Sequence, residues 1–341
     1  MKKRYMIFAV LIILLFTATA TGCPADEEPM TQSSFYVMFI DVGQADASLI
    51  MCDGRYMLID GGNTEDSSRI YSVLKDKGVE VLDYVVSTHA HEDHIGGLPA
   101  AFNCCQVQTV FSPVTEYDTS TFAKLKNAAR AQGKSLVMPK LGQKYSLGSA
   151  FFTVFAPLRK DYEEVNDSSI VLKLEYGDTS FLFTGDAERL SEYDMVEAGY
   201  DLSADVLKVG HHGSYTSTSY LFLREVMPTY GVISLGKGNE YGHPHDEILS
   251  RLNNADVQVL RTDELGDIIC HSDGATVRFE GIEPDVRGTP PAGRFVGNKK
   301  TGILHHNSCS GLPKENNRLY FCTITDAARA GYIKYCTNCM P

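Results

Sequence analysis

The chain contains the run His89-Ala90-His91-Glu92-Asp93-His94, which directly follows a predicted strand at 83–87. On an extended loop, the alternating His89 and His91 can face one metal ion. Asp93 and His94, just beyond them, can turn toward a second ion roughly 4 Å away. Imidazole nitrogens and carboxylate oxygens are ligands of catalytic zinc or manganese. A lone histidine on such a loop is usually structural, but this spacing predicts a two-metal centre.

Strand and helix signals alternate in clusters on both sides of this stretch. Aromatic and β-branched runs predict strands at 35–40, 48–51, 56–59, 83–87, 107–111, 151–155, 170–176, 180–184, 205–209 and 231–235. Apolar residues at helical spacing predict helices at 66–77, 121–132, 187–198, 217–226 and 246–254. This order predicts an α/β fold in which two sheets form a sandwich covered by helices, an αββα arrangement. Gly96 and Gly97 are expected where the backbone packs close to the metals.

Six further segments resemble the metallo-β-lactamase superfamily, whose motif is His-x-His-x-Asp-His. More closely, the chain resembles the hydrolase domain of ComEC-type competence proteins. The segments occur in the family's order, at residues 39–47, 58–62, 166–172, 183–187, 207–214 and 241–244. The resemblance covers a domain expected at 35–284, and it implies the αββα fold, two divalent ions (zinc or manganese) and hydrolase activity.

The resemblance also implies metal ligands at matching positions. Asp186 matches the carboxylate that bridges both ions, and His243 matches the last histidine of the family. His243 is therefore expected to complete the second ion's shell beside Asp93 and His94.

One departure from the family concerns the first ion, which is expected at His89 and His91. Many members complete its shell with a histidine that has no counterpart in the stretch 166–169. The substitute is expected to be His212, with His211 in an outer shell or on the substrate. The reverse assignment of these two histidines stays open.

The expected chemistry follows from the ions, which lower the pKa of a shared water from near 16 toward about 7 and supply hydroxide. The candidate catalytic residues are Asp93 or Asp186 as proton acceptor, with His211 and Asn166 on the substrate. A simple turn is the alternative role for Asn166. Asp41 is expected either to orient a ligand histidine or to cap the end of a strand.

The N-terminus predicts export. Positive residues at 2–4, an apolar run at 5–16 and small residues before Cys23 are typical of a lipoprotein signal at 1–22. Cys23 would then carry a lipid anchor on the membrane, and residues 23–34 would form a polar tether. The protein would be a cell-surface lipoprotein or secreted; an ordinary signal or an uncleaved anchor is the alternative. Five further cysteines are expected to be free thiols, and a disulfide among them is the alternative. They are Cys52, Cys104, Cys105, Cys270 and Cys322.

Residues 285–293 are rich in proline and glycine and predict a linker to a small unit at 294–341. In that unit, His305 and Cys309 form one close pair, and Cys336 and Cys339 form another. Two such pairs are typical of a structural tetrahedral zinc, which a unit of this size needs in order to fold. Disulfides among its cysteines are the alternative. The unit resembles the zinc-binding domain of Ada proteins, but His305 stands at the first cysteine position, so methyl transfer is not expected.

The net charge of −12 is unevenly distributed. Residues 294–341 contain seven basic and two acidic residues, an excess of five positive charges, so residues 1–293 carry −17. A basic appendage on an acidic body suggests contact with nucleic acid, although such an excess also occurs on plain surfaces.

These features together predict a metal-dependent phosphodiesterase, in effect a DNase acting on extracellular DNA. One alternative is a hydrolase of another phosphodiester, such as a phosphocholine ester on a surface polymer. A second alternative is a catalytically idle DNA-binding surface protein. DNA or RNA, the identity of the metal and the oligomeric state are not determined by the sequence.

Overall fold

The computed structural model describes residues 35–282, 295–307, 309–321, 327–328 and 330–339. They belong to the compact unit Ser33–Pro341. The expected signal, tether and linker, with Cys23 and Cys322, lie outside these ranges. Within them, no helix has the length and apolar character that a membrane span requires.

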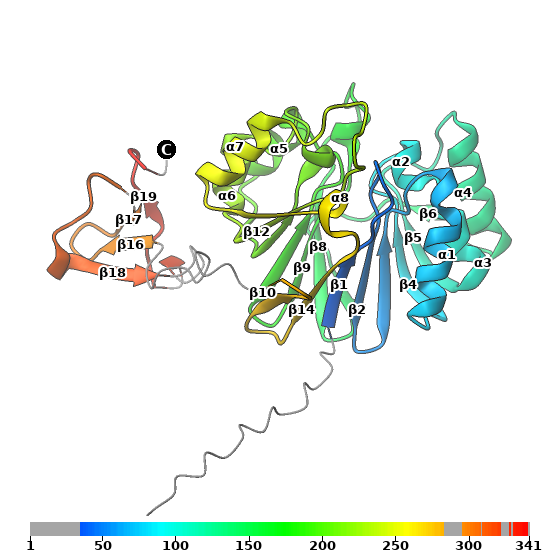
Figure 1. Ribbon diagram of the computed structural model, residues 1–341, viewed down its shortest axis with the longest axis horizontal. Helices are drawn as coiled ribbons and strands as arrows, with labels where there is room; N and C mark the ends of the chain where they lie inside the picture. Colours follow the sequence, from blue (N-terminus) through cyan, green and yellow to red (C-terminus); the bar gives the residue numbers. More distant parts are fainter. Residues whose placement is uncertain (1–34, 283–294, 308, 322–326, 329, 340–341) are drawn as a thin grey trace, which may run out of the picture. The chain divides into compact units, whose positions relative to one another are not determined.

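The first sheet has eight strands in the order β15-β14-β1-β2-β3-β4-β5-β6. Its strands are β1 (Phe35–Phe39), β2 (Ser48–Cys52), β3 (Arg55–Ile59), β4 (Val81–Val86), β5 (Gln106–Phe111), β6 (Leu136–Val137), β14 (Ile268–Ser272) and β15 (Val277–Phe279). Its helices are α1 (Ser67–Asp76), α2 (Glu92–Ile95), α3 (Pro99–Cys104) and α4 (Ser120–Ala131). Helices α1, α3 and α4 cover its outer face (Figure 1).

The second sheet has seven strands in the order β13-β12-β11-β10-β9-β8-β7. Its strands are β7 (Lys144–Leu147), β8 (Ala150–Ala156), β9 (Val171–Tyr176), β10 (Thr179–Phe183), β11 (Val206–Lys208), β12 (Tyr230–Ile233) and β13 (Gln258–Arg261). The helices of this half are α5 (Arg189–Glu197), α6 (Tyr220–Val226), α7 (Asp246–Asn254) and the short α8 (Thr262–Leu265). Helices α5, α6 and α7 cover the outer face of this sheet.

Strand alternation explains the layers, because successive side chains of a strand point to opposite faces. On β1, Val37 and Phe39 point into an apolar cluster between the two sheets, where Phe152 and Phe181 of the second sheet meet them. Met38 points the other way, into the cluster beneath the helices. The inner cluster and the two outer clusters confirm the expected αββα sandwich.

Every strand and helix expected from the sequence is present, with ends that differ by a few residues. The sequence pattern missed others, notably β14 and β13. Strand β14 pairs antiparallel with β1, although more than two hundred residues separate them. Its sequence, Ile-Ile-Cys-His-Ser, is short and combines apolar with polar residues, so it does not predict a strand by itself. The pairing with β1 stabilises this segment as a strand.

The C-terminal residues form a separate four-stranded sheet in the order β18-β16-β17-β19. The strands are β16 (Phe295–Asn298), β17 (Ile303–His306), β18 (Arg318–Phe321) and β19 (Lys334–Tyr335). Among the described residues of this unit, the apolar cluster is small and consists of Phe295, Leu304, Phe321, Ala327 and Tyr332. So small a core agrees with the expectation that this unit needs another source of stability.

Candidate metal centre

The histidine-rich stretch leaves the carboxyl end of β4, and the other metal-ligand candidates leave the ends of β10 and β11. Strands β10 and β11 are parallel neighbours, so the loops that follow them meet at one edge of the second sheet. Asp186 follows β10, and His211 and His212 follow β11 within the 3-10 helix η3 (Gly210–Gly213). Such an edge is where α/β folds form their sites.

Gly96 and Gly97 allow a close approach, but to backbone and not to the ligand side chains. A Cβ atom on Gly96 would lie 2.3 Å from the backbone nitrogen of Thr64, and one on Gly97 would lie 2.1 Å from the carbonyl oxygen of Gly61. These glycines therefore allow the backbone after α2 to pack directly against the loop after β3. This packing holds the histidine-rich stretch in position.

One group of ligand atoms consists of Asp93, His94, Asp186 and His212, whose ligand atoms all lie within 4.8 Å of one another. Nε2 of His212 lies 3.2 Å from Oδ2 of Asp93. Nε2 of His94 lies 3.3 Å from Oδ1 of Asp186. These separations suit ligands that share one ion at about 2.1 Å each.

Further histidines lie near Oδ2 of Asp186 and form the second group of candidate ligands. Nε2 of His89 lies 3.0 Å from Nδ1 of His91 and 3.8 Å from Oδ2 of Asp186. Nε2 of His211 lies 3.7 Å from the same carboxylate oxygen. Asp186 thus has histidine nitrogens near both of its oxygens, as a bridging carboxylate requires.

Four histidines turn the same ring atom inward. The Nδ1 atom of each contacts another residue of the protein. Nδ1 of His89 lies 3.2 Å from Thr88, and Nδ1 of His94 lies 2.9 Å from Asp60. Nδ1 of His211 lies 3.1 Å from Glu188, and Nδ1 of His212 lies 3.0 Å from the carbonyl oxygen of Ser234. Their Nε2 atoms are left for the centre. An outer hydrogen bond that fixes the ring of a metal ligand is the usual pattern in metalloproteins.

Two buried atoms inside the centre lack a hydrogen-bond partner within the described part of the chain, Nε2 of His94 and Oδ1 of Asp186. Both residues are almost fully buried, and a buried polar atom without a partner is costly. A divalent cation between them would satisfy both, so the residues present fit the expected two-ion centre.

The charges of the centre also favour a bound metal ion. Burial opposes the charged form of His212, yet the carboxylates of Asp186 and Asp46 raise its pKa to about 10. Burial would raise the pKa of Asp93, but His94 brings it down to about 2. A cavity that holds a proton on a buried imidazole is strongly negative, and a metal ion entering it would displace that proton.

Two buried carboxylates missed by the sequence analysis support the ligands. Asp60 accepts hydrogen bonds from the backbone and hydroxyl of Thr88 and contacts His94. Asp46 accepts a hydrogen bond of 2.8 Å from the buried ammonium group of Lys208 and lies 3.4 Å from Nδ1 of His212. Asp60 follows β3 and Asp46 precedes β2, so only the folded sheet brings them to the histidines.

Glu188 is a third carboxylate that the sequence analysis did not select. Its Oε1 atom accepts hydrogen bonds from Asn166 and Thr216 and lies 3.1 Å from Nδ1 of His211. The hydrogen bond with His211 is the main cause that lowers the pKa of Glu188. The amide oxygen of Asn166 is buried without a partner among the described residues. The position of Glu188, two residues after Asp186, is the feature of the sequence that could have identified this residue.

The backbone turns sharply between the two groups. His211 has φ 50° and ψ 48°, and His212 has φ 53° and ψ 24°. Two successive non-glycine residues in the left-handed region are unfavourable, and such strain is concentrated at functional sites. The turn directs the ring of His211 toward Asp186 and that of His212 toward Asp93.

Three placements differ from the sequence expectation. His212 lies with Asp93 and not with the first histidine pair. The ring centroid of His243 is 6.3 Å from that of His212, and Nδ1 of His243 contacts Gln44, so His212 occupies the place expected for His243. Asp41 accepts a hydrogen bond from the backbone of Gly43 and does not contact a ligand histidine in the described structure, which is the capping alternative.

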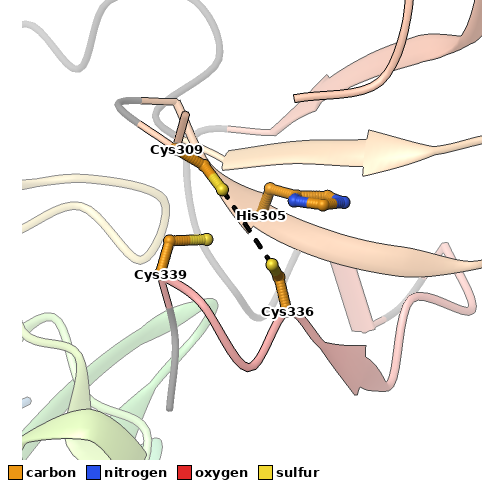
Figure 2. Close-up of side chains that lie close together, drawn as sticks. All are labelled: His305, Cys309, Cys336 and Cys339. Carbon is orange, nitrogen blue, oxygen red and sulfur yellow. Dashed lines mark hydrogen bonds between the residues drawn. The ribbon is translucent and has the colours of Figure 1, made fainter. Parts of the chain in front are cut away.

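A second candidate metal site lies in the C-terminal unit. Ligand atoms of His305, Cys309, Cys336 and Cys339 all lie within 4.8 Å of one another (Figure 2). The Sγ atoms of Cys309 and Cys336 are 3.9 Å apart, far beyond a disulfide bond of about 2 Å but close to the spacing of two thiolates on one zinc. Nδ1 of His305 is buried and has no hydrogen-bond partner among the described residues.

The remaining described cysteines, Cys52, Cys104, Cys105 and Cys270, are free thiols. Burial raises the pKa of Cys52, as it does that of Cys270, which favours the neutral thiol in both. This agrees with the default expectation for these four residues.

Comparison with known proteins gives the following matches. The family described as the metallo-beta-lactamase superfamily matches residues 40–237. The chain is 33% identical over 258 residues to ComE operon protein 3 of Bacillus subtilis, covering 70% of this chain and 33% of that protein. It is 29% identical over 241 residues to competence protein ComA of Neisseria gonorrhoeae, covering 70% and 32%. The chain thus spans about a third of the length of these curated relatives.

Among solved structures, the chain is similar to the metallo-beta-lactamase fold protein YhfI from Bacillus subtilis. The TM-score is 0.47 at 13% identity, covering 72% of this chain and 99% of that one. A diphosphatase from the PhnP family matches with a TM-score of 0.40 at 14% identity, covering 66% and 94%.

Proposed function

Because the chain belongs to the metallo-beta-lactamase superfamily, we propose that this hydrolase is a metal-dependent phosphodiesterase that cleaves DNA outside the cell. The observation that carries the proposal is the pair of donor groups around Asp186, each with inward histidine nitrogens. When bound, two divalent ions would polarise the phosphodiester and supply hydroxide at neutral pH.

The ligand sets follow from the two groups. The first ion would be held by His89, His91, Asp186 and His211, and the second ion would be held by Asp93, His94, Asp186 and His212. This assignment would give each ion four protein donors and make Asp186 the shared one. It is supported by the distances from Asp186 to His89, His94 and His211 and from His212 to Asp93.

The surrounding residues keep the centre rigid and anionic. Asp60 holds the ring of His94, and Glu188 holds that of His211, so neither ring has to reorient when substrate arrives. Glu188 also holds Asn166, whose unpartnered amide oxygen can accept a hydrogen bond from the substrate or its bound water.

Nucleic acid is the proposed substrate because two relatives carry the printed names ComE operon protein 3 and competence protein ComA. The basic residues of the C-terminal unit support the same substrate, since phosphate contacts supply much of the affinity for DNA. In that unit, one structural zinc on His305, Cys309, Cys336 and Cys339 would stabilise the small sheet. Export with a lipid anchor on Cys23 belongs to the same proposal.

The test uses protein spanning residues 33–341, the compact unit of the chain, loaded with Mn²⁺ or Zn²⁺. It is incubated with plasmid, single-stranded DNA and p-nitrophenyl phosphorylcholine, beside an Asp186→Asn variant. Cleavage of DNA by the wild-type protein alone is the expected result. Turnover of the choline ester without DNA cleavage would favour the surface-polymer phosphodiesterase, and binding of DNA without any turnover would favour the idle binding protein.

A further inference from the structure

A row of aromatic rings runs outward from the metal centre. The ring of His243 lies 5.8 Å from that of His211, measured between centroids, and stacks on Tyr241 at 5.6 Å with an interplanar angle of 22°. On its other side, His243 contacts His245 at 4.9 Å, and His245 contacts Tyr215 at 5.0 Å. The two tyrosines at the ends are 69% and 49% exposed, although tyrosine usually buries its ring.

The backbone that carries these rings is held in place by hydrogen bonds. Asn239 donates from its side chain to the carbonyl of His243 at 2.7 Å and accepts from the backbone nitrogen of the same residue at 2.9 Å, which closes the loop carrying Tyr241. The backbone nitrogen of Tyr215 donates to Nδ1 of His245, and Arg189 donates to the carbonyl of Tyr215. Exposed rings on fixed backbone are suited to bind a flat ligand at little entropic cost.

We propose that the exposed ring of Tyr241, beside His243, forms a stacking subsite for an unpaired nucleobase next to the phosphodiester being cleaved. This rests on the proposed function and adds a ligand class to it. Every base offers a π-face, and stacking on an aromatic side chain contributes without regard to base identity. A paired base presents no free face, so the subsite favours single-stranded nucleic acid.

A quaternary ammonium group could also bind aromatic rings, through cation–π attraction. The surroundings disfavour it here. Arg189 is exposed and donates a hydrogen bond to the backbone carbonyl of Tyr215, so a positive group lies beside these rings. A nucleobase beside an anionic phosphate suits this environment better than a choline head group does.

The first test compares esters that share one leaving group. Thymidine 5′-(p-nitrophenyl phosphate), methyl p-nitrophenyl phosphate and p-nitrophenyl phosphorylcholine differ only in the group that would meet the rings. We expect the wild-type protein to prefer the thymidine ester over the methyl ester by about tenfold in kcat/KM. Tyr241→Ala should remove most of that preference, and Tyr241→Phe should retain it because stacking needs the ring and not the hydroxyl.

The matched control is Tyr71→Ala on α1, a tyrosine that is 43% exposed on the first sheet's helices; it should leave the preference unchanged. A preference for the choline ester, or an unchanged thymidine preference in Tyr241→Ala, would overturn the proposal. Since Tyr241 is exposed, its replacement does not threaten folding.

A binding measurement separates this inference from the proposed function. Fluorescence anisotropy with the Asp186→Asn variant would compare a labelled oligothymidylate with an abasic strand of equal length. Weaker binding of the abasic strand, with the difference lost on adding Tyr241→Ala, supports the subsite even if no ester is hydrolysed. Equal affinity for the two strands refutes it even if DNA is cleaved.

Discussion

Oε1 of Glu188 lies 3.1 Å from Nδ1 of His211, while Nε2 of the same ring lies 3.7 Å from the central carboxylate of Asp186. The imidazole is thus held between an outer and an inner carboxylate. With Nδ1 engaged by Glu188, only Nε2 can serve the first ion. We therefore propose that His211 takes the role of the histidine that the stretch 166–169 lacks.

Replacing Glu188 with Gln should weaken binding of one of the two ions by about 10- to 100-fold, because the outer partner orients the ligand ring. Calorimetric titration of metal-free protein with Mn²⁺ measures the affinity of each ion. Glu197→Gln, an exposed change on the same helix, α5, is the control. If both ions bind the Glu188 variant as tightly as the wild type, His211 is not the ligand.

His91→Ala should abolish hydrolysis and leave the fold intact. The side chain would contribute a nitrogen to the first ion, whereas the core is formed by apolar clusters that do not include it. Turnover is measured beside far-UV circular dichroism, with His271→Ala on β14 as the control. Activity above about a tenth of the wild-type value would contradict a metal-dependent nucleophile.

Metal analysis of zinc-loaded protein should give about three ions per chain, two at the centre and one in the C-terminal unit. The double change Cys336→Ser and Cys339→Ser should remove one ion and lower the stability of that unit only, because a structural zinc contributes about 10–16 kcal/mol of apparent binding energy. Cys104→Ser, which alters a half-buried thiol outside both sites, should retain all three. A stoichiometry unaffected by the double change would exclude the C-terminal site.

Glu192 should make stability depend on pH near neutrality. Burial raises its pKa to about 7, although the backbone nitrogens of Thr218 and Ser219 donate to it. The folded state therefore binds a proton more tightly than the unfolded chain does, so this group's contribution to stability is fully present below pH 4.5 and is lost as pH rises through 7.

Between pH 8 and pH 6 the wild-type free energy of unfolding should therefore gain about 1 kcal/mol relative to Glu192→Gln. Urea denaturation of metal-free protein at the two pH values measures the difference. Parallel pH profiles for the two proteins would show that Glu192 does not titrate in this range.

The basic C-terminal unit should contribute phosphate contacts. Lys299→Glu with Lys300→Glu should weaken DNA binding and reduce the slope of log affinity against log salt by about two. Affinity at low and moderate salt is compared with that of Lys124→Glu with Lys140→Glu, two exposed lysines of the hydrolase part. Equal losses in the two pairs would mean that general charge, and not this unit, determines the affinity.

The fold follows from the sequence, which also supplies most of the candidate ligands. The spacing of His89, His91, Asp93 and His94 identifies a two-ion centre, because these residues are neighbours in the chain and local geometry suffices to group them. Aromatic and β-branched runs such as 35–40 predicted the central strands, since both faces of these strands pack into apolar layers. Strands β13 and β14 were not predicted from the sequence. They are stabilised by pairing with strands that are distant in the chain, and a local sequence pattern does not show such pairing.

Only the tertiary structure places the rings of His211 and His212 in different groups of candidate ligands. His211 and His212 are adjacent in the chain, and their directions depend on a left-handed backbone turn that sequence patterns do not predict. The outer carboxylates Asp46, Asp60 and Glu188 come from three separate loops, and each reaches its histidine only when the two sheets have packed. A contact between residues that are distant in the chain forms only when the two sheets pack. The local sequence around either residue therefore does not predict it.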